Sequence, residues 1–125
     1  VMAATTPGAT LDAWARHVAG YLHALLPVAR GIERARRTDP EAAALWDTAM
    51  DAWRGACQVV VGRVEAAGQL APPWDEGTAV DLLWALMGIE LLEDLVEEAG
   101  WGVDAYAERL ALLARRTLLV DPTAG

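Results

Sequence analysis

Apolar side chains recur at the three- and four-residue spacing of an α-helix along most of this 125-residue chain. Leucine and alanine dominate, and no run of β-branched residues alternates with polar ones for long enough to form a strand. We therefore expect an all-α fold. The pattern predicts a five-helix antiparallel bundle over residues 10–120, with a disordered or loop segment at 1–9 and a tail at 121–125.

Two local signals place the first two helices. Thr10 is a predicted N-cap, because a threonine hydroxyl can accept a hydrogen bond from an unpaired backbone N–H of the first turn. Pro27 is predicted to break the apolar stripe that begins at Leu11, because proline has no N–H for the helical ladder. Pro27 can also begin a short second helix, which we expect to end near Arg37.

A long third helix is predicted between two clear boundary signals. The sequence Thr-Asp-Pro-Glu at 38–41 combines a cap, a proline in the first turn and an acidic residue. The apolar period then continues to about Gly68, and a proline-containing linker follows at 71–75. Its apolar rows cover more than half of the circumference, so we expect this helix to be central to the monomer.

The fourth helix is expected to run from a cap at Asp75 or Thr78 to Gly100, and the fifth to fill 103–119. Residues 82–89 contain no charged side chain, and a helix that is apolar all round must be covered on every side. One small chain has few elements left to cover it, so we predict a homodimer that pairs through the last two helices. The predicted dimer interface comprises Leu83, Met87, Leu91, Leu110 and Leu113.

Aromatic residues gather on the predicted first and third helices, with one more on the fourth. Apolar walls with a few polar tips are typical of small-molecule sites, because burial supplies affinity and the tips fix orientation. The predicted ligand-binding residues are Trp14, His17, Tyr21, Trp46, Met50, Trp53, Cys57 and Trp84. The alternative is that these side chains simply fill the core, and Trp84 could equally belong to the dimer interface.

Charge and cysteine content restrict the partners. The net charge of −8 repels nucleic-acid phosphates, so the arginines at 30, 34, 36 and 37 are interpreted as a solvated face that balances nearby acids. A single cysteine excludes an internal disulfide and is compatible with the cytoplasm. No stretch reaches the ~20 apolar residues of a membrane span, so no membrane association is expected.

Catalytic and metal chemistry find little support in the sequence. The chain has no serine or lysine, and His17 and His23 lie on different helical faces. Cys57 has no second cysteine at metal-ligand spacing, so a buried thiol is the preferred interpretation over a metal ligand or a nucleophile. Residues 100–105 match the G-x-G-x-x-A dinucleotide pattern but follow a helix instead of a strand. The acidic side chains within residues 90–98 are interpreted as a solvated helical face and not as a cation site. We expect no metal, no cofactor and no enzymatic activity.

Several soft motifs occur in an order that resembles the C-terminal half of TetR/AcrR-family transcriptional regulators. They are the segments Arg-Val-Glu-Ala-Ala-Gly-Gln-Leu at 63–70 and Ala-Val-Asp-Leu-Leu-Trp-Ala-Leu-Met-Gly at 79–88, then Gly100-Trp101-Gly102, Tyr106 and Leu110. The resemblance implies a domain that dimerises through its last two helices and holds a small-molecule pocket. It also implies that DNA is bound by a helix-turn-helix domain, which this sequence does not contain.

The residues and the resemblance together lead to one functional expectation. The chain is expected to be the small-molecule-sensing and dimerisation domain of a TetR-like repressor, with an apolar or aromatic effector. Ligand binding would alter the spacing of DNA-reading heads outside this chain and release the operator. The alternative from another class is a helical dimerisation or protein-interaction module without a ligand.

Overall fold

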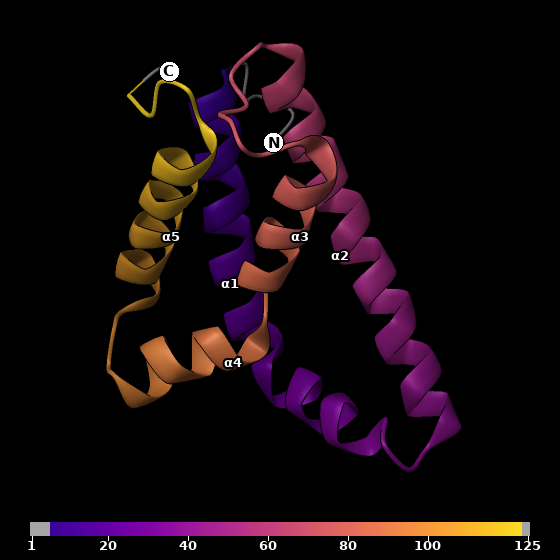
Figure 1. Ribbon diagram of the computed structural model, residues 1–125. Helices are drawn as coiled ribbons and strands as arrows, with labels where there is room; N and C mark the ends of the chain where they lie inside the picture. Colours follow the sequence, from indigo (N-terminus) through magenta and orange to yellow (C-terminus); the bar gives the residue numbers. More distant parts are fainter. Residues whose placement is uncertain (1–5, 124–125) are drawn as a thin grey trace.

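The computed structural model describes residues 6–123, and within them it is helical with no strand. The elements in chain order are α1 (Pro7–Ala35), α2 (Pro40–Ala66), α3 (Glu76–Leu86), α4 (Ile89–Leu92), the π-helical turn η1 (Glu93–Glu98) and α5 (Val103–Leu118) (Figure 1). α1 runs through the middle and packs against α2, α4 and α5, while α3 packs against α2. The all-α prediction is confirmed, with five α-helices whose boundaries differ in part from those expected.

The first helix begins earlier than predicted. Thr6 is the N-cap, its hydroxyl accepting a hydrogen bond of 3.1 Å from the N–H of Ala9, and Pro7 occupies the first turn. Thr10 lies inside the helix, where its hydroxyl donates to the carbonyl of Thr6 at 2.9 Å. The predicted loop at 1–9 is therefore wrong from residue 7 onward, because both threonines can cap and the earlier one does. Residues 1–5 of that prediction lie outside the described residues.

Pro27 does not end the first helix, so the separate short second helix is also a wrong prediction. α1 continues through Pro27 to Ala35 and bends in its second half (Figure 1). Tertiary contacts hold this half in place: the Arg30 guanidinium donates to Glu93 at 2.6 Å and to Glu97 at 3.3 Å, which ties α1 to η1. These charge-assisted bonds favour continuing the helix despite the hydrogen bond that proline removes.

The long helix α2 agrees with its sequence signals. Asp39 is the N-cap and accepts a hydrogen bond of 2.9 Å from the N–H of Glu41, with Pro40 in the first turn. After Ala66 the chain turns through Gly68, whose φ of +70° lies in the left-handed region that glycine adopts readily. α2 runs back beside the first half of α1 and lies farther from it at its own N-terminal end, toward which the second half of α1 bends (Figure 1).

The single fourth helix that the sequence predicted is interrupted. Asp75 and Thr78 cap α3 reciprocally, as expected, but the helix stops at Leu86 and Gly88 has an extended ψ of 137°. α4 and η1 then run across the end of the bundle (Figure 1). Glycine resists helical continuation, and the Met87 side chain next to it points into the core. Burial of Met87 therefore competes successfully with a continuous helix.

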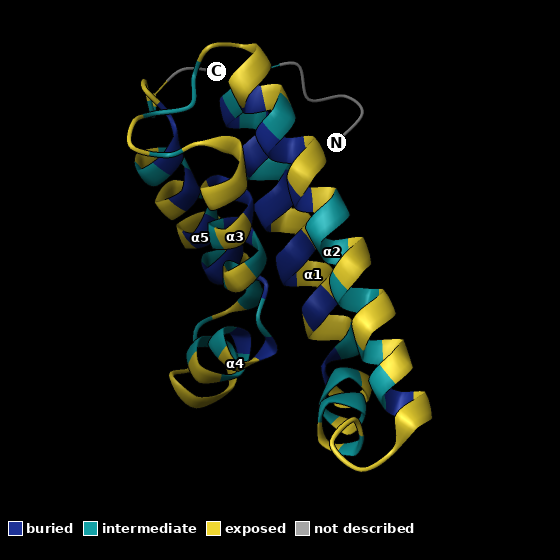
Figure 2. Ribbon diagram, turned by 45° about the vertical axis from the view of Figure 1, so that its right-hand side comes forward, coloured by how far each residue is buried: buried dark blue, intermediate teal, exposed yellow. Residues whose placement is uncertain are grey.

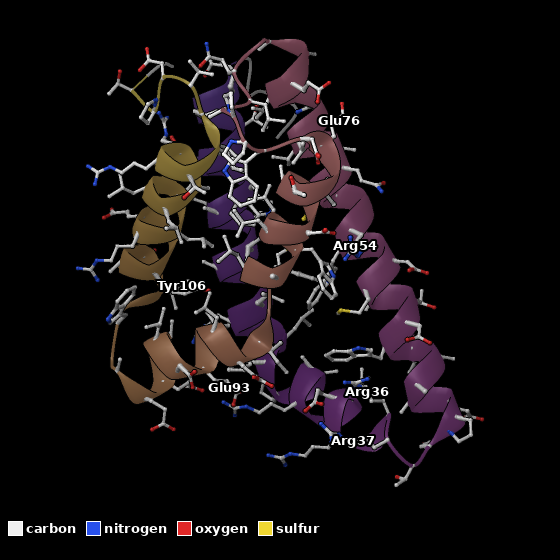
Figure 3. All side chains as sticks on the ribbon, viewed as in Figure 1. Arg36, Arg37, Arg54, Glu76, Glu93 and Tyr106 are labelled. Carbon is white, nitrogen blue, oxygen red and sulfur yellow. The ribbon has the colours of Figure 1, made fainter. Side chains whose placement is uncertain are left out.

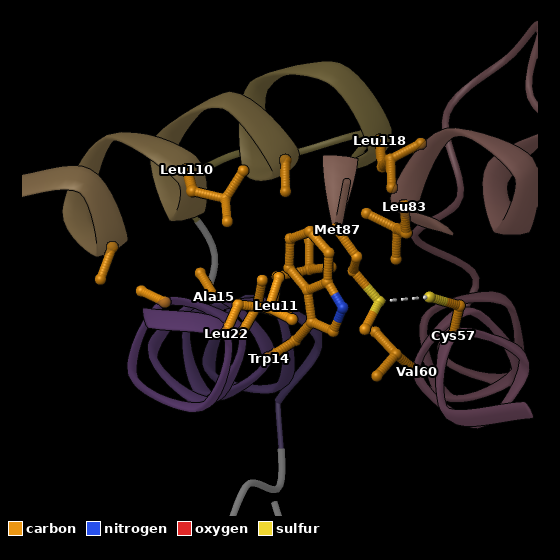
Figure 4. Packing of buried hydrophobic residues seen from close by; sticks show 14 of the residues in the cluster. Leu11, Trp14, Ala15, Leu22, Cys57, Val60, Leu83, Met87, Leu110 and Leu118 are labelled. Atoms are coloured by element: carbon orange, nitrogen blue, oxygen red, sulfur yellow. Dashed lines mark hydrogen bonds between the residues drawn. The ribbon is translucent and has the colours of Figure 1, made fainter. Parts of the chain in front are cut away.

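This interruption lets one chain cover the segment at 82–89. Leu83 is 0 % exposed, and Met87 and Ile89 are buried with it in the core (Figure 4). Of the predicted interface, Leu83, Met87 and Leu110 lie in the core of the single chain, Leu91 is half-buried and Leu113 is exposed. The apolar segment alone therefore does not demand a second copy.

α5 is confirmed close to its predicted boundaries and closes the fold. It follows Gly100, whose φ is +80°, and packs along α1. The Arg115 guanidinium donates to both carboxylate oxygens of Asp12, at 2.8 and 2.7 Å, and joins the C-terminal end of α5 to the start of α1. An isolated antiparallel bridge between Leu70 and Leu119 ties the α2–α3 linker to the same end.

Candidate ligand-binding groove

Two adjacent apolar pockets lie between α1 and α2 and share four lining residues, and we refer to them together as the groove, with a wide and a narrow lobe. The wide lobe has a volume of about 570 Å³ and extends from Trp14 to Tyr21 along α1. The narrow lobe, of about 220 Å³, continues from Tyr21 toward Ile32. The residues that line both lobes, and so form the junction between them, are Tyr21, Leu45, Ala49 and Trp53.

The groove exists because α2 carries apolar side chains along its whole length, but other helices cover them along only part of it. Apart from Ala42, its buried residues are Cys57, Val60, Val61 and Val64, all in its second half. Figure 2 shows mainly exposed and half-buried residues over the first half, where α1 and α2 diverge. The first half therefore presents apolar side chains to an open groove.

Tryptophans form much of the groove wall. Trp53 is half-buried at the junction of the lobes, and Trp14, 3 % exposed, lies at the base of the wide lobe. Trp46 lines the narrow lobe, and the Arg36 guanidinium stacks on its ring at 4.8 Å. This contact orients an indole that is otherwise half-exposed.

The polar side chains that line the groove are few. His17 and Tyr21 stack with ring centroids 5.5 Å apart and planes inclined by 10°, and both side chains are exposed at the rim. Thr48 adds a hydroxyl to the wide lobe. Such an arrangement can bind an apolar molecule by burial and orient it with a small number of hydrogen bonds.

Six of the eight predicted ligand-binding residues line this groove: Trp14, His17, Tyr21, Trp46, Met50 and Trp53. Cys57 lies behind it, 0 % exposed, with its sulfur 3.4 Å from that of Met87 (Figure 4). Burial raises the pKa of the Cys57 thiol to about 11, against smaller lowering effects of the Trp14 indole and Arg54. A thiol in this state is a poor nucleophile and a poor metal ligand.

Trp84 lies outside the groove, on α3. Its ring is covered by the Arg54 guanidinium at 4.5 Å, and Arg54 also donates to Asp81 at 2.8 Å, which links α2 to α3 (Figure 3). The prediction grouped Trp84 with the other tryptophans by residue type. Helical period alone does not say on which side of α2 the fourth helix packs.

Sequence analysis missed four groove residues on the second half of α1: Leu25, Val28, Ala29 and Ile32. The signal was present, because these residues continue the apolar stripe of the first half at three- and four-residue spacing across Pro27. Interpreting Pro27 as a helix end assigned Val28, Ala29 and Ile32 to another element, whereas Leu25 remained in the predicted first helix. Val28 is 60 % exposed and Leu45 opposite is 59 % exposed, so the narrow lobe is open to solvent.

The predicted dimer residues mark a second, smaller depression between α5 and the α4–η1 segment. Leu91, Leu110 and Leu113 line this pocket of about 290 Å³. Tyr106 lies at its base (Figure 3), and burial raises the pKa of its hydroxyl. The Arg109 guanidinium stacks on Trp101 at 4.7 Å. The pocket is thus apolar with one cation at its edge.

The arginines of the first helix pair mainly with acids. Arg30 binds Glu93 and Glu97, and Arg36 and Arg37 lie 3.6 and 3.5 Å from Glu33. Between residues 6 and 123 no group of three or more histidine, cysteine or acidic side chains has the geometry to hold a metal ion. No helix in the same range combines the length and apolarity that crossing a membrane requires.

Comparisons of the chain with known protein families, with curated proteins and with solved structures give no match.

Proposed function

We propose that this chain is a non-enzymatic, small-molecule-sensing regulatory domain of a cytoplasmic TetR-like transcriptional repressor. The observation that carries the proposal is the gathering of six predicted residues, five of them aromatic and the sixth a methionine, around one apolar groove. The effector is an apolar or aromatic molecule that binds between α1 and α2. DNA is contacted only by a domain outside this chain, in keeping with the net charge of −8.

Links between the groove and α4 and η1 allow ligand binding to change the positions of these elements. Its narrow lobe is built on the second half of α1, which Arg30 ties to η1 through Glu93 and Glu97. Its wide lobe contacts Met87, at the interruption between α3 and α4. A ligand that favours one separation of α1 and α2 shifts the population of positions of α4 and η1.

The groove is tested by replacing Trp53 with alanine. Titration with the neutral fluorescent dye N-phenyl-1-naphthylamine should show saturable binding to the unaltered chain, and Trp53→Ala should weaken it about tenfold or more, because the indole wall of both lobes is lost. Trp101→Ala is the matched control, since Trp101 lines the pocket beside α5 instead. Circular dichroism monitors folding. Equal loss in the two variants, or none in either, contradicts the proposed site.

We also propose that two copies pair through the α4–α5 side, with Leu91 and Leu113 in the contact. Leu113 is 49 % exposed in the single chain, which makes it available to a partner. Leu113→Glu should raise the dimer dissociation constant about tenfold or more in sedimentation equilibrium, because a buried charge opposes association. Leu112→Glu is the control, since Leu112 is 45 % exposed but lines a different depression. A chain that remains monomeric at high concentration contradicts the pairing.

One observation favours a second candidate function, a helical interaction module without a small-molecule effector. The groove is open along its length, and Tyr21, Val28 and Leu45 on its rim are 41 %, 60 % and 59 % exposed. An amphipathic helix of another protein could bury these side chains by docking along α1 and α2. Absence of saturable dye binding, together with binding of a helical peptide, would favour this function over the sensor.

A further inference from the structure

We infer that the effector is an elongated molecule without an anionic group and that it occupies both lobes of the groove; this inference rests on the proposed function and specifies its ligand. Neither lobe is lined by an aspartate, glutamate, lysine or arginine, although the chain has 18 acidic residues and 10 arginines. The other depressions described above, beside α5, each include an arginine, among them Arg109 and Arg115. The groove therefore differs from these depressions in having no arginine, lysine or carboxylate side chain in its lining.

The arginines nearest to the groove are already engaged elsewhere. Arg36 stacks on Trp46 and lies 3.6 Å from Glu33, and both Arg36 and Glu33 line a neighbouring depression outside the two lobes. Arg54 is held by Trp84 and Asp81 on the α3 side. An anionic group on the ligand would find no arginine or lysine among the lining residues of either lobe to pair with. An anion would in addition meet the net negative charge of the chain.

The shape and the polar groups orient the ligand. The lining of α2 extends from Leu45 to Ala56, which corresponds to about 17 Å at the rise of an α-helix. His17 and Thr48 line only the wide lobe, whereas the narrow lobe adds only aliphatic and aromatic side chains and a methionine. The hydrogen-bonding end of the ligand therefore lies in the wide lobe and its hydrocarbon or aromatic end in the narrow lobe.

Two dyes with one aromatic skeleton test the charge requirement. N-phenyl-1-naphthylamine is neutral, and 1-anilinonaphthalene-8-sulfonate carries the same rings with a sulfonate. We expect the neutral dye to bind the full chain about tenfold more tightly or better, as measured by fluorescence titration at one ionic strength. Equal or tighter binding of the sulfonate overturns the inference that the ligand has no anionic group.

A series of straight-chain alcohols tests the length requirement. Displacement of the neutral dye by 1-hexanol, 1-octanol, 1-decanol and 1-dodecanol should strengthen about two- to fourfold with each added carbon, because each buries one more methylene. Decanoate, with the chain of decanol and a carboxylate, should displace the dye far less well. A plateau already at hexanol overturns occupation of both lobes.

A variant at the junction of the lobes separates failure of this inference from failure of the proposed function. Ala49 lines both lobes, so Ala49→Phe should fill the junction and weaken binding of the neutral dye about tenfold. Ala44→Phe makes the same change at an exposed position of α2 outside the groove and should leave binding intact. The two dyes could bind the unaltered chain equally tightly and both be blocked by Ala49→Phe. In that case the site stands and only the inferred class of ligand is wrong. If neither dye responds to Ala49→Phe, the proposed site itself fails.

Discussion

Replacement of Leu83 by alanine is expected to lower the free energy of unfolding by about 3 kcal/mol. Leu83 is 0 % exposed and belongs to the central core cluster together with residues of α1, α2 and α5 (Figure 4). Truncation removes buried methyl groups and leaves a cavity that rigid helices cannot close completely. Urea denaturation followed by circular dichroism measures the change.

The same experiment tests whether Leu83 belongs to the core or to a dimer interface. Because the structure buries Leu83 within one chain, the loss should be the same at low and high protein concentration. Leu113→Ala is the matched control at a position that is 49 % exposed, and it should change the stability of the monomer by less than about 1 kcal/mol. A Leu83→Ala effect that varies with protein concentration would restore the original interface prediction.

Cys57 is expected to react with iodoacetamide about a thousandfold more slowly in the native protein than in urea. The side chain is 0 % exposed, so reagent reaches it only when the chain opens. Burial also raises the pKa of the thiol to about 11, which disfavours the reactive thiolate. Mass spectrometry of samples quenched over time measures the two rates. Fast native alkylation would show that the α2–α3 contact opens readily.

The raised pKa of the Cys57 thiol also predicts how the free energy of unfolding changes at alkaline pH. Below the ordinary thiol pKa of 9.0 both the folded and the unfolded chain keep the proton. As the pH rises from there toward about 11, the unfolded chain loses its proton first, so the free energy of unfolding decreases. Cys57→Ala should remove this part of the alkaline decrease, and an unchanged slope would contradict it.

The local signals of the sequence were reliable where a single element contains all the groups involved. The cap of α2 at Asp39 and the reciprocal cap of Asp75 and Thr78 join residues only two or three positions apart. Such short-range hydrogen bonds form in any fold that contains the helix, so they can be predicted from sequence alone.

Of the three wrong helix boundaries, the start of α1 at Thr6 instead of Thr10 has a local cause, and the other two had their causes outside the helix concerned. Continuation through Pro27 is supported by Arg30, which binds acids more than sixty positions away, at Glu93 and Glu97. Interruption at Gly88 accompanies burial of Met87 against Cys57 of another helix. Neither partner could be assigned from spacing, because helical period says which side chains share a face but not what that face meets.

In the candidate site, too, the sequence predicted the features that lie within one helix but not those that depend on contacts between helices. The sequence identified six of the groove residues, since aromatic and polar side chains at helical spacing on α1 and α2 mark faces that can bind a ligand. It placed Cys57 and Trp84 with them, and the structure assigns both to packing between helices. It did not find Val28 and Ile32, because they lie beyond a proline that the tertiary fold accommodates.

The sequence by itself determined that this protein is helical, where α2 and α3 are capped, and which side chains are too apolar to face water alone. These properties depend on the helical period and on contacts within a few residues. The tertiary structure alone decided that Leu83 and Leu110 are covered inside one chain and that the first half of α2 stays open beside α1. The physical reason is that hydrophobic burial is non-directional: it requires that an apolar face be covered, and only the packed chain determines which element covers it.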